Sequence, residues 1–131
     1  MFLSELTAEQ KRALLVLARQ VIAADERLAF QELERLEALY HEADLPPETP
    51  DAPDVVADLN YMFPSARARA VVVLELLMVA LADASVDRRE LRAVRAIAEA
   101  MEVSEADWEA MRDWAGRYAA LVAEARAFGQ A

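Results

Sequence analysis

The sequence predicts a small, single-domain, all-α fold, and three observations support that prediction. Only two glycines occur in 131 residues, whereas turn-rich β folds need glycine at many corners. Alanine, leucine, glutamate and arginine are abundant, and these residues lose little conformational freedom in a helix. Hydrophobic residues make up 56% of the chain, which is enough for a core and too many for a disordered protein.

The first half of the chain is predicted to form a helical hairpin over residues 8–42. Thr7 and Gln10 have the spacing of a capping box, in which two side chains satisfy free backbone N–H groups. Apolar residues then recur at helical spacing to about residue 24, and a short turn leads to a second helix. The segment 43–53 holds four prolines and is predicted to be a loop, because proline lacks the donor that a helix interior needs.

The second half is predicted to form a second hairpin over residues 66–101. A short helix at 54–60 and an apolar exit at 61–64 are expected before it, and Ser65 is its expected N-cap. From Val71 onward its first helix is apolar on nearly every face, which is typical of a helix surrounded by others. We therefore expect this helix to lie at the centre of the fold.

The last helix is predicted over residues 104–128, with Ser104 as its N-cap and a weak point at Gly116. Its apolar residues form two stripes. The first is expected to pack against the core and consists of Trp108, Met111, Ala115, Tyr118 and Val122. The second consists of Trp114, Leu121 and Phe128, and its exposure would indicate a contact with a partner or a second copy.

The two hairpins match when the sequence is shifted by 58 residues. Asp25 then falls on Asp83, and Glu32 falls on Glu90. Each copy consists of a helix, an Ala-Asp pair, a short turn, a glutamate and an amphipathic helix. We expect the two copies to pack their apolar faces together. The alternative is a chance match between helices rich in alanine, leucine and glutamate.

The acidic turn of the second copy is a candidate site for a divalent cation. Asp83, Asp87 and Glu90 lie within eight residues, and carboxylate oxygens are the donors that Ca²⁺ and Mg²⁺ prefer. In the first copy Asp25 and Glu32 are the corresponding candidate ligands. Structural capping is the alternative, because an acidic N-cap with a glutamate three residues later satisfies the N–H groups at a helix start.

With these two turns the chain resembles the TerB-like family associated with bacterial tellurite resistance, which also includes the N-terminal region of the membrane-anchored DjlA co-chaperones. The segments that carry the resemblance are 21–25 with Glu32, and 80–83 with Asp87 and Glu90. The glycine that usually follows each aspartate in the family is missing here, which changes the backbone conformations open to the turns. The resemblance implies an all-helical fold and a stress-linked, metal-associated role, and it implies no established catalytic activity.

Composition narrows the possible functions further. The absence of cysteine excludes disulfides, thiolate nucleophiles and cysteine-ligated metal sites. A net charge of −10 disfavours nucleic acid as a partner, because affinity for phosphates comes largely from lysine and arginine. The longest apolar run, 70–82, is too short to span a bilayer, so we expect a cytoplasmic protein without direct membrane insertion. One histidine, one lysine and no glycine-rich phosphate loop do not suggest an enzyme.

Charged side chains at two further places invite interpretation. Arg88, Arg92 and Arg95 form a basic stripe at helical spacing, which is either a solvated face or a docking surface for an acidic partner or another copy. Glu75 lies in the apolar central helix and is expected to point to a groove or to solvent. If it is buried, its charged form is costly unless an arginine pairs with it, and burial would make it a candidate site.

The leading hypothesis is a non-enzymatic binding or scaffolding module of TerB-like type, which works in a bacterial stress-response complex through a protein partner or self-association. The alternative is a divalent-cation-binding protein whose functional site is the acidic turn 83–90.

Overall fold

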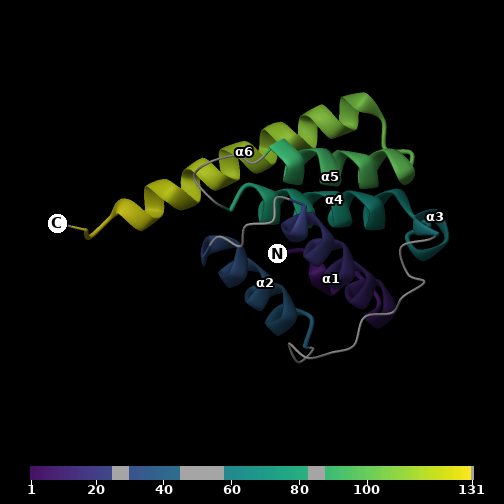
Figure 1. Cartoon of the computed structure of the whole chain (residues 1–131), viewed down its shortest axis with the longest axis horizontal. Coiled ribbons are helices and arrows are strands. Elements are labelled where there is room, and N and C mark those ends of the chain that lie inside the picture. The colour runs from purple at the N-terminus through teal and green to yellow at the C-terminus, as the bar shows by residue number, and fades with distance from the viewer. Residues whose placement is uncertain (25–29, 45–57, 83–87, 131) are drawn as a thin grey trace.

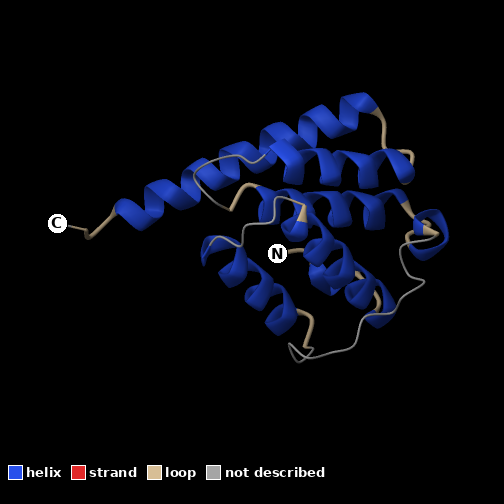
Figure 2. Cartoon of the chain, viewed as in Figure 1, coloured by secondary structure: helices blue, strands red, loops and turns tan. Residues whose placement is uncertain are grey.

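The structure is a computed structural model that describes residues 1–24, 30–44, 58–82 and 88–130, and for residues 30–34 the backbone alone. Every regular element in these residues is helical (Figure 2). The elements are a short 3₁₀ helix, η1 (Leu3–Glu5), and the α-helices α1 (Ala8–Ala23), α2 (Phe30–Glu42), α3 (Leu59–Met62), α4 (Ala66–Ala80), α5 (Arg88–Ala100) and α6 (Glu105–Ala127). The all-α prediction is confirmed.

Helix α4 lies at the centre of the bundle, as its apolar sequence predicts. It contacts α1, α2, α5, α6 and η1, and Figure 1 shows it between α1 and α5. Ten of its fifteen residues are buried, and Glu75 is the one charged residue among them. A helix with so little polar surface is stable in water only when other helices cover it.

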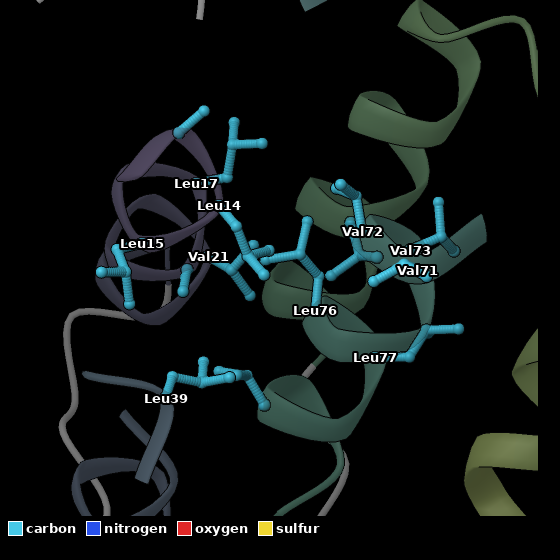
Figure 3. Packing of buried hydrophobic residues seen from close by; sticks show 14 of the residues in the cluster. Leu14, Leu15, Leu17, Val21, Leu39, Val71, Val72, Val73, Leu76 and Leu77 are labelled. Atoms are coloured by element: carbon cyan, nitrogen blue, oxygen red, sulfur yellow. The ribbon is translucent and has the colours of Figure 1, made fainter. Parts of the chain in front are cut away.

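The hydrophobic core joins the two predicted hairpins. Side chains of α1 and α4 meet between these helices, and Leu39 reaches the same core from α2 (Figure 3). Leu14, Leu17, Leu76 and Leu39 are all fully buried. Burial of each such side chain contributes about 1.5–3 kcal/mol. The hairpins therefore share one core, which agrees with the predicted packing of their apolar faces.

The helices begin where their N-cap residues predict. Thr7 accepts a hydrogen bond from the Gln10 backbone N–H, and the Gln10 side chain accepts one from the Thr7 N–H. Ser65 and Ser104 each accept the backbone N–H of the residue three positions later. These bonds satisfy donors that have no partner inside the helix.

The starts of the helices follow the offset of the sequence match. Helices α1 and α4 begin at Ala8 and Ala66, which are 58 positions apart, while the described parts of α2 and α5 directly follow segments 25–29 and 83–87, which lie outside the described residues. These bounds fit the proposed register, while the origin of the hairpins by duplication stays a prediction. The two predicted acidic turns and most of the proline-rich loop lie outside the described residues.

The segment before α4 differs from the prediction. Helix α3 begins at Leu59, so the first half of the predicted exit 61–64 is helical, while residues 54–57 lie outside the described residues. Asp58 explains the start, because its side chain accepts the backbone N–H of Tyr61. The N-cap signal of this aspartate outweighs the periodicity, which is ambiguous over so few residues.

The predicted extent of the last helix is confirmed, and the weak point at Gly116 stays a prediction. Helix α6 runs without interruption through Gly116. A glycine costs a helix interior about 1 kcal/mol relative to alanine. Packing next to it offsets that cost, since Trp108 and Ala115 on the same helix are buried in the core.

Helix α5 ends in a motif with left-handed backbone. Glu102 has a φ of 62°, and the N–H of Val103 donates to the Ala98 carbonyl at 3.0 Å. The Glu102 N–H donates to the Glu99 carbonyl at 2.9 Å, which completes the pattern of a Schellman motif. Glycine is the usual residue at this position, so Glu102 adopts a conformation that is costly for it.

Candidate functional site

Of the five residues predicted to ligate a cation, Glu90 is the one whose side chain the structure describes. It lies in the first turn of α5 and is fully buried. Asp25, Asp83 and Asp87 lie outside the described residues, and Glu32 belongs to the part of α2 described by its backbone alone. Within the described ranges, no three His, Cys, Asp or Glu side chains lie close enough together to hold a metal ion.

The burial of Glu90 is unusual for a residue beside a predicted acidic turn. Its carboxylate shares one face of α5 with buried Val94 and Ala98, so it points into the fold and not to water. A buried carboxylate is costly unless positive charge or hydrogen bonds compensate it, and the N-terminus of a helix supplies part of that charge. Its oxygens are the hard donors that Ca²⁺ and Mg²⁺ prefer.

The predicted basic stripe on α5 is divided by its ion pairs. Arg88 and Arg92 are exposed on α5. Arg95 donates to Glu105 at 2.7 and 2.9 Å and to Glu99 at 3.3 Å. The charge of Glu105 is the main cause of a raised pKa at Arg95. Arg95 thus links α5 to the start of α6, which leaves Arg88 and Arg92 as the accessible part of the stripe.

The predicted exposure of Glu75 is wrong. Its side chain is fully buried, and three donors surround its carboxylate. The Met1 ammonium and the Phe2 N–H each donate to Oε1 at 2.7 Å, and Arg35 donates to Oε2. Burial is possible because two positive groups compensate the charge. The carboxylate therefore joins α4 to α2 and to the N-terminal segment.

Glu42 completes this cluster from the end of α2. Its Oε1 accepts from the Met1 ammonium at 2.8 Å, and its Oε2 accepts from the Leu3 N–H at 2.9 Å. Partial burial acts to raise the pKa of Glu42, but the ammonium and the Leu3 N–H outweigh it and lower the pKa below the usual 4.5. The N-terminal segment is therefore held by two carboxylates from different helices.

Sequence reasoning missed this role of the N-terminal segment. Residues 1–6 are too few to show a helical period, and an ammonium group leaves no pattern in the sequence. The available signal is the presence of three apolar residues in this short segment, Phe2, Leu3 and Leu6, because apolar side chains are stabilised by packing against another surface. Leu3 and Leu6 are indeed buried. Glu5 adds a bidentate pair with Arg67 of α4, with both contacts at 2.8 Å.

The C-terminal half of α6 and the residue that follows it carry large exposed apolar side chains. Figure 1 shows this part of the helix (yellow) extending past the rest of the bundle. Leu121 is 63% exposed and Phe128 is 77% exposed. By contrast, Trp108 and Ala115 in the first half are buried against the core. The predicted division into a core-facing stripe and an exposed stripe is confirmed for these four residues.

The exposed apolar residues continue a row that starts inside the fold. Trp114 contacts Phe2 with ring centroids 6.0 Å apart, and it stacks on Tyr118 at 5.5 Å. Both rings are half-buried, and the row then passes into the exposed part of the helix. We call this row the α6 stripe: Trp114, Tyr118, Leu121, Ala125 and Phe128. The bundle thus fixes one end of an apolar row whose other end is open to solvent.

None of the described helices combines the length and the apolar character needed to span a membrane. The exposed apolar surface of α6 lies at the end of the helix that extends past the bundle. This apolar surface covers one side of one helix, and such a surface can pack against a helix or enter a groove on a partner.

Comparison with known proteins gives a family match for this chain. The model of the family described as Tellurite resistance protein TerB matches residues 43–113, which is more than half of the chain. The match contains α3, α4, α5 and the first part of α6, and therefore both buried glutamates, Glu75 and Glu90. No curated protein and no solved structure matches the chain. The predicted resemblance is confirmed: the chain belongs to the TerB family.

Proposed function

We propose that the chain is a non-enzymatic binding module of the TerB family, and that it works by docking a protein partner in a stress-response complex. The observation that supports this proposal is the exposure of Leu121 in α6 and of Phe128 at its C-cap, where the helix extends past the bundle. Association buries large apolar side chains of this kind, and their removal from water is favourable in free energy.

The charged groups of the core fit a scaffold better than a catalyst. A catalytic acid or base must reach a substrate proton, but the Glu75 carboxylate already accepts hydrogen bonds from Met1, Phe2 and Arg35. The partner Glu42 is likewise occupied by the ammonium and by Leu3. These groups fix the N-terminal segment against α2 and α4, so their chemistry is structural.

Partner capture tests the proposal. The tagged chain is used to capture proteins from its host, with and without tellurite, and the bound proteins are quantified. We expect a protein whose recovery falls at least tenfold with Leu121→Glu. Ala123→Glu is the matched control, because it adds the same charge at an exposed position on the opposite side of α6. Equal recovery with all three forms would remove the α6 stripe as the docking surface.

The second candidate function is binding of Ca²⁺ or Mg²⁺ at the turn that leads into α5. The position of Glu90 favours it, because this residue lies in the first turn of α5, directly after that turn, and carboxylate oxygens are the hard donors that Ca²⁺ and Mg²⁺ prefer. Asp83 and Asp87 would supply the remaining carboxylates.

The basic residues Arg88 and Arg92 are a second candidate docking surface, for an acidic partner.

Thermal unfolding tests the cation candidate. Binding at about 100 times the dissociation constant stabilises a protein by about 2.7 kcal/mol, which raises its melting temperature by several degrees. The increase should vanish when Asp83→Asn is combined with Glu90→Gln. Glu99→Gln is the control, since it removes an exposed carboxylate from the same helix. An unchanged melting temperature with Ca²⁺, Mg²⁺ and Zn²⁺ would rule this candidate out.

A further inference from the structure

The spacing of the α6 stripe is that of a helix-pairing surface. Trp114, Tyr118, Leu121, Ala125 and Phe128 follow one another at intervals of four and three residues, which are the a and d positions of a heptad. Residues at this spacing stay on one side of a helix and pack against a second helix. The last three are exposed in the structure. The exposed part of the stripe can therefore pack against a second helix beyond the edge of the bundle.

Charge distinguishes this segment from the rest of the molecule. The whole chain carries a net charge of −10, so two copies repel each other over most of their surfaces. Residues 114–128 contain two arginines, Arg117 and Arg126, and one glutamate, Glu124. This segment is therefore slightly positive, and it is a surface through which two acidic copies can approach without bringing carboxylates together.

The two charges beside the stripe favour one orientation. Arg117 and Glu124 are seven residues apart, so they occupy the same heptad position, and both are exposed. In an antiparallel pair, Arg117 of one helix lies beside Glu124 of the other, and the two-fold axis repeats the contact. A parallel pair does not bring these two residues together. Antiparallel pairing also matches side-chain sizes, because it sets Trp114 opposite Ala125 and Tyr118 opposite Leu121.

We propose that the partner of the α6 stripe is a second copy of this chain, and that the two α6 helices pair antiparallel through residues 114–128. This inference rests on the proposed function, since it names the partner of the same surface. The contact involves one short helix segment from each copy, which is below the standard size of a stable interface. Association is therefore weak, with a dissociation constant on the order of 10–100 µM.

Sedimentation equilibrium of the full chain tests this proposal. We expect a monomer–dimer equilibrium that Leu121→Glu weakens at least tenfold and that Ala123→Glu leaves within about twofold. Circular dichroism of each variant confirms that the helices are retained. A chain that stays monomeric at all concentrations up to about 1 mM, or one that both variants weaken equally, overturns the proposal.

A charge exchange tests the antiparallel arrangement. Arg117→Glu places a second carboxylate beside Glu124 of the other copy at two symmetric contacts, and we expect at least a threefold weaker dimer. Combining it with Glu124→Arg restores opposite charges at both contacts and leaves the net charge of the chain unchanged. Recovery of the original affinity supports antiparallel pairing, while an equally weak double variant refutes it. A monomeric chain that still captures a different protein through Leu121 sinks this inference and leaves the proposed function standing.

Discussion

Replacement of Glu75 by leucine tests how the buried cluster supports the fold. The substitution keeps the volume of the side chain close to its original value and removes the carboxylate that accepts from Met1, Phe2 and Arg35. Arg35 is 20% exposed, so its guanidinium is left with limited access to water. The N-terminal ammonium keeps its contact with Glu42 and loses the stronger, fully buried partner.

The expected loss follows from this geometry. Removal of one member of a buried ion pair costs about 3–5 kcal/mol, because the remaining charge stays desolvated. The native state of a small domain is stable by about 5–15 kcal/mol, so the variant should fold with much reduced stability. Arg35→Met in the same chain removes that stranded charge. We expect the double variant to recover at least about 1 kcal/mol relative to Glu75→Leu.

Urea unfolding followed by far-UV circular dichroism measures these differences. Glu99→Leu is the control, because Glu99 is 67% exposed and its pair with Arg95 is a surface contact worth at most about 1 kcal/mol. A loss below about 1 kcal/mol for Glu75→Leu would refute the reasoning, as would a double variant that is less stable than the single one.

Three further predictions follow from the described contacts. The lowered pKa of Glu42 means that its ionised form stabilises the fold, so this stability is full above about pH 4.5 and is lost as the pH falls through the folded pKa. The Glu42→Gln variant should therefore have urea midpoints that depend less on pH between about 6 and 3. An unchanged pH dependence of the midpoint would contradict this prediction. Glu102→Gly relieves the left-handed backbone and should raise the unfolding free energy by about 0.5–1 kcal/mol, whereas a loss in the same urea titration would be inconsistent with strain there. Leu76→Ala opens a cavity in the shared core and should cost about 2–5 kcal/mol by thermal unfolding, and a cost below about 1 kcal/mol would argue against full burial.

The helices and their order were predictable because the local signals agree. Thr7, Ser65 and Ser104 are N-caps that precede long segments with helical periodicity, and each start lies where its cap predicts. The central position of α4 was predictable because its sequence has almost no polar face. Gly116 does not interrupt α6, since a local propensity of about 1 kcal/mol is small beside the packing of neighbouring residues.

The candidate sites were predictable to a lesser extent. The burial of Glu75 depends on Arg35, which is 40 positions away, and on the N-terminal ammonium, so no local pattern reveals it. The exposed end of α6 was recognisable as a stripe, but its exposure depends on where the other helices stop. Sequence periodicity shows which residues share a face and leaves open what covers that face.

The central claim is that the α6 stripe is the binding surface, and amide hydrogen exchange tests it most directly. Exchange is compared between the chain alone at low concentration and the chain in its complex, whether with a second copy or with a captured protein. We expect slower exchange at residues 117–128 in the complex, because pairing suppresses the fraying of the extended end of α6. Unchanged exchange there, with protection around Arg88 and Arg92 on α5 instead, would contradict it.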